Sequence, residues 1–233
     1  MKGFGNLLTV ANAKTIKGEK LGYLTGILYM SPERQGPDGR NMCEYSTPGC
    51  RAGCLNTAGR GTFSNVQAGR ARKRALFVAY PTEFVLHLHV EIAALQRRAK
   101  HLGMRPVVRL NGTTDLDWPT IAPSLFTAFP RVKFYDYTKH APRMTAPRPA
   151  NYDLTYSRAE GRDAAARAVL AHGGRVAVVF STRRGQPLPK LWEDYRVKDG
   201  DRHDLRFLER SGVVGLRAKG RARYDRSGFV VTA

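Results

Sequence analysis

The three cysteines of the chain lie within a stretch of twelve residues. Cys43, Cys50 and Cys54 stand at a C-x6-C-x3-C spacing in the segment MCEYSTPGCRAGCLNTAGRGT (residues 42–62). Three thiolates can bind zinc together with a fourth ligand, or three irons of a cubane cluster. The sequence therefore predicts a metal at these cysteines, either zinc or an iron–sulfur cluster, with incidental thiols as the alternative. The candidate fourth ligands are His87, His89, His140 and His203.

The expected compartment agrees with a metal at these thiols. The sequence contains no apolar run long enough to span a bilayer, and its first residues do not follow the pattern of a signal peptide. We therefore expect a cytoplasmic protein with no membrane partner. Thiols stay reduced in that compartment, so a metal or redox role is favoured over a structural disulfide.

A pair of carboxylates follows an apolar segment in VVRLNGTTDLDW (residues 107–118). Asn111 and Gly112 form a turn signal, and Asp115 and Asp117 come shortly after it. An extended backbone would put both carboxylates on one side, where like charge raises one pKa and separates an acid from a base or nucleophile. The alternative is that one of the two aspartates caps a helix beginning near Trp118.

Two further strand ends carry polar side chains. Asp136, in FYDYTK, should point into the same mouth of a parallel sheet as Asp115, unless it only forms a turn. Ser157, in TYSRAE, could bind a polar ligand, but with Glu160 it also forms an S-x-x-E pattern, and for that pair we prefer the helix-capping interpretation. The candidate substrate-binding residues are Asn111 and Ser157.

The charge balance is strongly basic, with 39 lysines and arginines against 19 aspartates and glutamates and a formal charge of +20. Basic side chains bind phosphates and release condensed counterions, which favours a nucleic-acid partner. The alternative is an ordinary solvated charged surface. The candidate nucleic-acid-binding residues, in which Tyr224 would stack on a base, are Arg60, Arg70, Arg72, Lys73, Arg74, Lys219, Arg221, Arg223 and Tyr224.

An acidic segment, VKDGDRHDLRF (residues 197–207), places three aspartates around Gly200. It lacks the spacing and the terminal glutamate of an EF-hand, so calcium is disfavoured. The segment predicts a turn or a helix cap.

Apolar runs rich in β-branched residues alternate with helical patterns along the chain. The expected strands are residues 22–30, 106–110, 132–137, 152–157, 175–180 and 212–218. The expected helices are residues 64–80, 82–103, 118–129 and 158–174.

This alternation predicts an α/β fold with mostly parallel strands, as a small or incomplete (β/α) barrel or, alternatively, an open doubly wound sheet. The length fits one α/β domain over residues 1–233, with a cysteine-containing loop at about 31–63 and a basic C-terminal segment at about 212–233.

Five segments together resemble the phage gene-product-88 domain family over most of the chain: CRAGCLNTAGRG, RLNGTTDLDW, FYDYTK, LTYSRAE and DGDRHDLRFLERSGVVGLRAKG. The resemblance implies a relation to phage DNA transglycosylases, which exchange guanine in DNA for a 7-deazaguanine base and are distantly similar to tRNA-guanine transglycosylases. It also implies a phage protein acting in the cytoplasm of the host cell, with duplex DNA and a small 7-deazaguanine base as partners.

The chemistry implied by this resemblance uses two carboxylates and a base flipped out of the duplex. One aspartate attacks the sugar C1′ to give a covalent glycosyl-enzyme, and a second carboxylate moves protons between the leaving and incoming bases. Mapped onto this sequence, Asp115 or Asp117 is one partner and Asp136 the other, with the nucleophile left open. The early cysteines differ from the late C-x-C-x2-C…H zinc site of tRNA-guanine transglycosylases.

The leading hypothesis is thus an enzyme, a DNA-guanine transglycosylase of the pentosyltransferase type. The first alternative is an iron–sulfur enzyme of radical-SAM-like type acting on nucleic acid. The second is a nonenzymatic DNA-binding module stabilised by zinc.

Overall fold

The structure of the protein is a computed structural model that describes residues 4–32 and 40–233. Residues 33–39, part of the expected cysteine-containing loop, lie outside this description. Within the described residues the strands are β1 (Leu8–Thr9), β2 (Tyr23–Leu28), β3 (Arg105–Arg109), β4 (Lys133–Thr138), β5 (Tyr152–Ser157), β6 (Arg175–Phe180), β7 (Leu191–Trp192), β8 (Tyr195–Asp199) and β9 (Gly212–Arg217).

These strands follow the order β1-β2-β3-β4-β5-β6-β9-β8-β7 in one mixed sheet. The pairs β2–β3, β3–β4, β5–β6, β6–β9 and β8–β9 are parallel, whereas β1 and β7 pair antiparallel with β2 and β8. The prediction of an α/β fold with mostly parallel strands is confirmed. Closure into a barrel stays a prediction.

The α-helices are α1 (Ala13–Glu19), α2 (Pro48–Ala52), α3 (Ser64–Ala79), α4 (Pro81–His101), α5 (Trp118–Ile121), α6 (Pro123–Ala128) and α7 (Asp163–Ala171). Short 3-10 helices are η1 (Leu55–Thr57), η2 (Gly59–Thr62), η3 (Ala141–Met144), η4 (Arg206–Leu208) and η5 (Gly220–Tyr224). None of the helices in the described part of the chain has the length and apolarity needed to cross a membrane.

All six expected strands are present, and two of them, β5 and β6, have the expected limits. The helix expected over residues 118–129 is divided into α5 and α6 at Ala122, because Pro123 disfavours a helical conformation in the residue before it. The expected cysteine-containing loop holds α2, η1 and η2, and the basic C-terminal segment holds β9 and η5.

The chain divides into two compact units. Unit 1 comprises residues 1–44, 63–136 and 148–153, and unit 2 comprises residues 45–62, 137–147 and 154–233. The expectation of one α/β domain over residues 1–233 stays a prediction.

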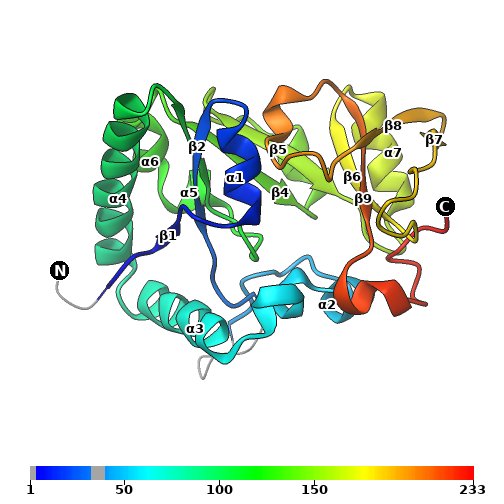
Figure 1. The fold of residues 1–233 in the computed structure, drawn as a ribbon, viewed down its shortest axis with the longest axis horizontal. Coiled ribbons are helices and arrows are strands. Elements are labelled where there is room, and N and C mark those ends of the chain that lie inside the picture. The colour runs from blue at the N-terminus through cyan, green and yellow to red at the C-terminus, as the bar shows by residue number, and fades with distance from the viewer. Residues whose placement is uncertain (1–3, 33–39) are drawn as a thin grey trace. The chain divides into compact units, whose positions relative to one another are not determined.

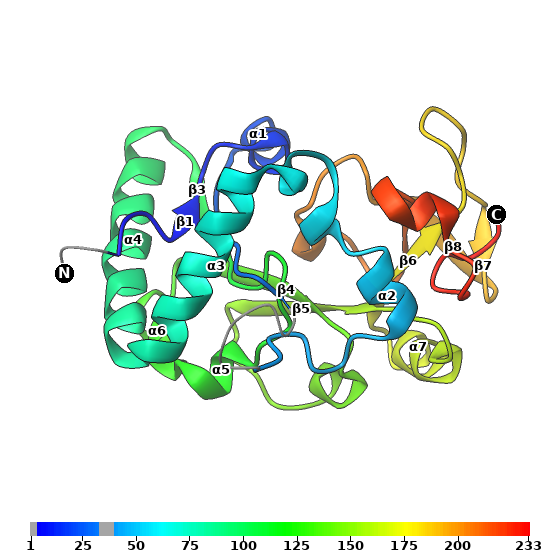
Figure 2. The same cartoon turned by 90° about the horizontal axis from the view of Figure 1, so that it is seen from below.

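The core of unit 1 forms where α4 packs on β2 and β3 (Figure 1). Every residue of β2 is buried, as expected for an interior strand with neighbours on both sides. Gly26 lets the layers approach, since a Cβ there would lie 3.1 Å from side-chain carbons of both Leu8 and Leu95. Helix α3 ends at Ala79 and α4 begins at Pro81, so one residue separates them. Figure 2 shows the two helices following each other along the chain.

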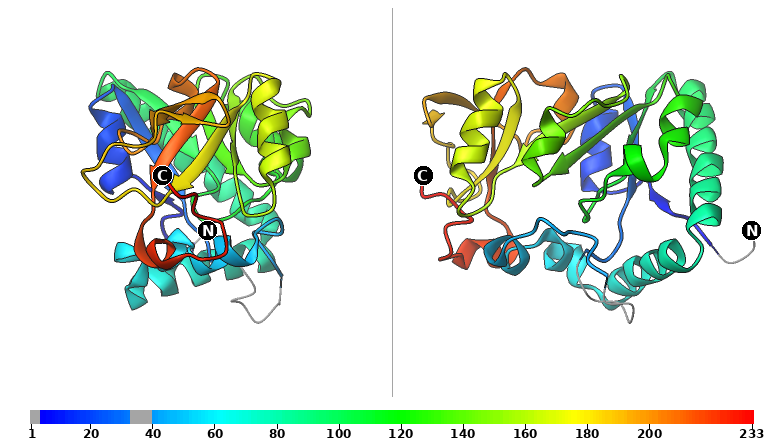
Figure 3. Two further views of the ribbon diagram at one scale, coloured as in Figure 1. Left: turned by 90° about the vertical axis from the view of Figure 1, so that its right-hand side faces the viewer. Right: turned by 180° about the vertical axis from the view of Figure 1, so that it is seen from behind.

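Unit 2 has its own apolar core, in which α7 packs against β6. Figure 3 shows the yellow helix α7 beside this strand. The buried residues of this core are Tyr156, Ala166, Val169, Leu170, Val176, Val178, Phe180 and Val213. Elsewhere in the same unit, α2 packs against η5, so residues near positions 50 and 222 of the sequence are neighbours.

Candidate functional site

A buried carboxyl group in unit 1 joins the ends of neighbouring strands. Asp136 lies in β4, which pairs in parallel with β3, and its side chain is 1% exposed. The backbone N–H of Asn111, just after β3, donates to Oδ1 of Asp136 at 2.7 Å. The hydroxyl of Tyr152, at the start of β5, lies 3.1 Å from Oδ2. Both carboxyl oxygens therefore have hydrogen-bond partners.

The pKa of Asp136 is shifted toward neutrality. Burial is the largest cause and raises the pKa of Asp136 to about 7, and the negative charge of Asp115 acts in the same direction. The Arg109 guanidinium and the hydrogen bonds from Asn111 and Tyr152 lower it, but by less than burial raises it. At neutral pH this carboxyl group can therefore both release and accept a proton.

The side chain of Asn111 organises the loop that carries Asp115. Its Oδ1 accepts hydrogen bonds from the Thr114 hydroxyl at 2.8 Å, the Leu116 N–H at 3.0 Å and the Trp118 indole N–H at 3.2 Å. Its Nδ2 donates to the carbonyl of Leu116 at 2.9 Å. Asn111 thus holds the shape of the loop, and substrate binding by this residue stays a prediction.

The two aspartates of the DLDW motif have different surroundings. Asp115 is buried, its N–H donates to the carbonyl of Met42 at 2.9 Å, and its charge acts on Asp136. Asp117 stands at the start of α5, where its carboxylate accepts a hydrogen bond from Thr120 at 3.2 Å. Asp117 holds the N-cap position of α5, but its side chain makes no capping hydrogen bond. Asp115, whose charge acts on the buried Asp136, is the better candidate for chemistry.

Sequence reasoning missed two residues of this site, Arg109 and Tyr152. Arg109 is buried at the end of β3, and its Nε donates to the carbonyl of Asn111 at 3.2 Å. An arginine inside an otherwise apolar strand is an available signal, because a buried charge needs a partner. Tyr152 carries no comparable signal, since tyrosine is common in strands.

The cysteines are divided between the units. Cys43 belongs to unit 1, and its N–H donates to Oδ1 of Asn41 at 2.8 Å. Cys50 lies in α2 and Cys54 begins η1, both in unit 2. Among the described residues no disulfide joins them, and no group of three or more histidine, cysteine or acidic side chains forms a metal-binding cluster. A metal at these thiols stays a prediction.

The four candidate histidines have varied contacts. In unit 1, His87 lies 3.1 Å from the carbonyl oxygen of Gly5, and His89 lies 3.1 Å from the hydroxyl of Ser124. In unit 2, the ring of His140 stacks on Tyr45 with centroids 4.0 Å apart. His203 lies near Glu209, with a nitrogen–oxygen distance of 3.9 Å.

The helix-capping interpretation of Glu160 is wrong. Helix α7 begins at Asp163, after Arg162, and no side chain caps it. The Glu160 carboxylate instead accepts hydrogen bonds from the N–H of Gly49 and the hydroxyl of Thr47, each at 2.6 Å. It therefore caps α2, the helix that contains Cys50, more than a hundred residues away in sequence.

Ser157, at the end of β5, contacts a buried lysine. Nζ of Lys139 donates to the Ser157 hydroxyl at 3.0 Å and also lies within hydrogen-bond distance of the carbonyls of Ser157 and Arg158. The Ser157 hydroxyl thus has a partner inside unit 2. A role for it in substrate binding stays a prediction.

The basic residues of α3 divide by exposure. Lys73 and Arg74 are buried, with Nζ of Lys73 donating to the carbonyl of Leu7 at 2.6 Å and Arg74 donating to the carbonyl of Arg40. Burial lowers the pKa of Lys73 to about 8. Both cations have protein partners, and phosphate contacts by these two residues stay a prediction.

The other two basic candidates on α3 also contact protein groups. Arg72 is exposed and donates to the carbonyl of Phe4, and the Arg70 guanidinium lies 5.2 Å from the centroid of the Tyr29 ring. Phosphate contacts by these two residues stay a prediction.

The basic candidates of unit 2 are more accessible. Arg60, Arg221 and Arg223 are exposed, and Tyr224 is 84% exposed. Ala222, between the two arginines of η5, is buried. The 3-10 turn thus directs its small residue inward and its cationic and aromatic side chains toward solvent.

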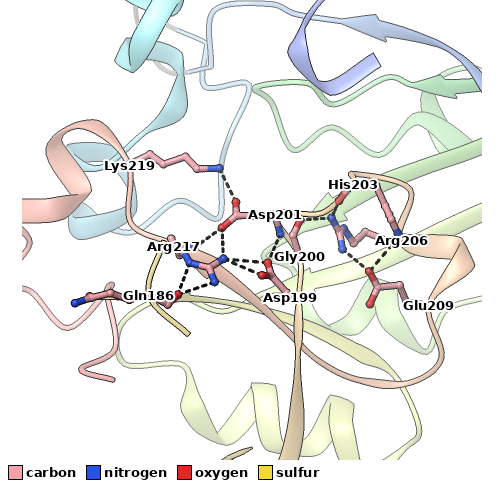
Figure 4. A network of polar contacts seen from close by, with 9 residues as sticks. All are labelled: Gln186, Asp199, Gly200, Asp201, His203, Arg206, Glu209, Arg217 and Lys219. Carbon is pink, nitrogen blue, oxygen red and sulfur yellow. Dashed lines mark hydrogen bonds and ion pairs between the residues drawn. The ribbon is translucent and has the colours of Figure 1, made fainter. Parts of the chain in front are cut away.

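The acidic segment forms a turn held by ion pairs (Figure 4). Arg217 Nη1 lies 3.0 Å from Oδ1 of Asp199 and 3.1 Å from Oδ2 of Asp201, and Nζ of Lys219 lies 2.6 Å from Oδ1 of Asp201. Burial alone would raise the pKa of Asp201, but the hydrogen bonds and charges of Lys219 and Arg217 lower it overall. The turn prediction for this segment is confirmed, and Lys219 already has an anionic partner.

A second part of the same network surrounds Arg206, whose side chain is fully buried. Its guanidinium donates to Oε1 of Glu209 at 2.7 Å, to the carbonyl of Gly200 at 2.6 Å and to the hydroxyl of Tyr137 at 2.8 Å. A buried cation with these partners is a structural element of unit 2.

Fold and site together define an α/β protein with a buried carboxyl group, Asp136, whose pKa is raised by burial and, to a smaller extent, by the charge of Asp115. The chain matches the family model described as gene product 88 over residues 6–233, and it belongs to this GP88 family. No curated protein and no solved structure matches the chain.

Proposed function

We propose that this GP88 protein is a DNA-modifying enzyme, a phage transglycosylase that exchanges guanine for a 7-deazaguanine base. The observation that carries the proposal is the pKa of Asp136, raised to about 7 by burial next to Asp115. A general acid–base group works best when its pKa lies near the operating pH. The relation to tRNA-guanine transglycosylases and a barrel-like closure of the sheet are parts of the same proposal.

The two carboxylates take separate roles in this scheme. The Asp115 carboxylate attacks C1′ of the deoxyribose, the C1′–N9 bond breaks, and the leaving guanine takes a proton from Asp136. The incoming base then gives its N9 proton to Asp136 and attacks C1′, which breaks the bond to Asp115. Asp136 suits the proton-carrying role because both of its oxygens are hydrogen-bonded and it is buried.

The basic composition supports DNA as the substrate. The formal charge of +20 and the exposed arginines of η5 favour a polyanionic partner, because basic side chains bind phosphates. The same exposed residues favour one second candidate, a nonenzymatic DNA-binding module. In that case binding would fall with salt, and substitution of Asp136 would change stability alone.

A test of the proposal uses labelled 7-deazaguanine and duplex DNA with the full chain. Incorporation is expected for the native protein and should fall by roughly 10²- to 10⁴-fold in Asp136→Asn, as for loss of a general acid–base group. Asp115→Asn should remove it. The matched control is Asp194→Asn, at an exposed position with φ of 63°, a conformation that asparagine adopts readily. Retained exchange in Asp115→Asn, Asp117→Asn and Asp136→Asn alike would overturn the carboxylate assignment.

Metal analysis of the natively purified protein separates this proposal from the iron–sulfur alternative. Stoichiometric zinc in a colourless sample would disfavour the iron–sulfur alternative. Iron and labile sulfide in a brown, anaerobically purified sample would favour it. Loss of that metal in a Cys50→Ser variant would assign it to the cysteine segment.

A further inference from the structure

The region around η5 in unit 2 has the features of a prepared binding surface. We propose that η5 and the adjacent segment of residues 55–62 form a platform for single-stranded DNA, with Tyr224 stacking on an unpaired base. The inference rests on the proposed function in one respect, since it names DNA as the partner. It concerns binding alone and requires no chemistry at Asp136.

Small residues allow the two segments of the platform to pack closely against each other. A Cβ at Gly53 would lie 3.0 Å from the Cβ of Ala222, and a Cβ at Gly220 would lie 3.0 Å from the Cβ of Ala58. The backbones of the two segments therefore approach closely at both points. Arg60, two residues after Ala58, is exposed and adds a positive charge to the segment that approaches η5.

The N-terminal side of η5 is held by the ion-pair network of Figure 4. Lys219 immediately precedes η5, and its ammonium group contacts Asp201 at 2.6 Å. Arg217, at the end of β9, is bound to both Asp199 and Asp201. These cations are engaged in positioning the turn, which leaves phosphate contacts to the exposed arginines that follow them.

The C-terminal side of η5 is held by Asp225 and Arg158. The carboxylate of Asp225 accepts hydrogen bonds from the Ser227 hydroxyl at 2.6 Å and the Val230 N–H at 2.9 Å. Arg158, itself buried, donates to the carbonyl of Phe229 at 3.0 Å. With both flanks fixed, little conformational freedom is lost when a ligand binds η5.

The exposed side chains of this platform point to an unpaired nucleic acid. Tyr224 is 84% exposed, far more than is usual for an aromatic ring, and it follows Arg221 and Arg223 on the same turn. Residues 45–62 contain no aspartate or glutamate, so the neighbouring segment adds no negative charge. Arginines contact phosphates while an aromatic ring stacks on a base face, and that face is accessible only where the base is unpaired.

The test measures binding of a fluorescent single-stranded oligonucleotide and of its duplex by anisotropy over a range of salt concentrations. Tyr224→Leu should weaken single-strand binding roughly 5- to 100-fold, and Tyr224→Phe should restore it, because stacking needs only the ring. The logarithm of the binding constant falls linearly with the logarithm of the salt concentration. Replacing both Arg221 and Arg223 by glutamine should reduce the magnitude of this slope for single strands by about 0.7 for each phosphate that the variant no longer neutralises.

Matched controls separate the platform from general effects. Tyr80→Leu removes another exposed tyrosine, and replacement of Arg97 and Arg98 removes two exposed charges on α4 in unit 1. Neither control should change single-strand affinity more than about 2-fold. Equal binding by Tyr224→Leu and the native protein, or equal losses for single strand and duplex, would overturn the proposal.

The same binding assay in Asp136→Asn keeps the two proposals distinct. The platform contains no part of the carboxyl site, so this variant should bind single strands with native affinity. If the native protein binds single strands but performs no base exchange, the proposed function is contradicted while the platform is supported. Weakened binding in Tyr224→Leu together with retained exchange on short substrates would support both.

Discussion

The N–H of Asn111 and Oδ1 of Asp136 are 2.7 Å apart, and this hydrogen bond joins the loop after β3 to strand β4. Because Oδ1 accepts this hydrogen bond, the proton of the neutral carboxyl group is expected on Oδ2. Protonated Oδ2 would donate to the Tyr152 hydroxyl, whereas the ionised form accepts from it at 3.1 Å. The contact between Asp136 and Tyr152 can thus serve both protonation states.

The stability of the protein should depend on the ionisation of Asp136. Its pKa is raised to about 7, so the folded state keeps this proton at pH values where the unfolded state, with a pKa of about 4, has released it. This contribution is fully present below about pH 4 and is lost as pH rises through about 7. Asp136→Asn resembles the protonated form and should remove this pH dependence.

Urea unfolding of both proteins at pH 5 and pH 8 checks this expectation. The variant should gain stability relative to the native protein on going from pH 5 to pH 8, by a few kcal/mol at most. A difference between the two proteins that is constant over this range would show that Asp136 has an ordinary pKa.

Two neighbouring substitutions should move the Asp136 pKa in opposite directions. Tyr152→Phe removes a hydrogen bond that lowers this pKa, so the pKa should rise. The ring itself is kept, and with it the packing against Phe126, in which the two ring centroids are 5.1 Å apart. Asp115→Asn removes a negative charge that raises the pKa, so the pKa should fall. Carboxyl-carbon NMR titration reads both shifts directly, and shifts of the same sign would refute the assigned electrostatics.

Glu160 should control the reactivity of Cys50. Glu160→Ala removes the acceptor for Gly49 and Thr47, which should destabilise the short helix α2 by about 1 kcal/mol and increase exposure of its thiol. Alkylation of Cys50, followed by mass spectrometry, should become faster in the variant. Cys43, in the other unit, is the internal reference and should react at an unchanged rate.

A pair of glycine substitutions should have opposite effects on stability. In Gly49→Ala the new Cβ would lie 1.9 Å from Oγ of Ser227 and 2.8 Å from Cβ of Phe229, so the overlap should cost about 1–3 kcal/mol. Gly69, inside α3, has no heavy atom within 4 Å of the Cβ position, and its replacement by alanine should stabilise by about 0.5–1 kcal/mol. Thermal unfolding of both variants measures the difference, and a tolerated Gly49→Ala would contradict the close packing of α2.

Local patterns in the sequence were sufficient for the main elements. Strands such as β5 and β6 are short apolar runs flanked by turn residues, and α4 shows apolar residues at helical spacing. The short strands β1, β7 and β8 and the helices α1 and α2 were not predicted, because elements of so few residues are defined mainly by their partners.

The candidate carboxylates were recognised from their positions after apolar strands, but their different roles were not. Asp115 and Asp117 are equivalent in a sequence pattern, and only the start of α5 distinguishes them. Likewise, Lys73 and Arg223 are both basic residues in basic segments, and the sequence does not distinguish them. Burial of Lys73 against Leu7 and exposure of Arg223 on η5 result from packing that sequence spacing does not encode.

The sequence by itself determined the α/β class, the placement of acidic residues at strand ends and the strongly basic charge balance, since these depend on local periodicity and composition. The tertiary structure decided which charges are buried and which residues meet. Tyr152 reaches Asp136 from a different strand, and Glu160 reaches α2 from more than a hundred residues away. Such contacts depend on how the chain packs, and burial together with neighbouring charges then sets the pKa values on which the proposed chemistry relies.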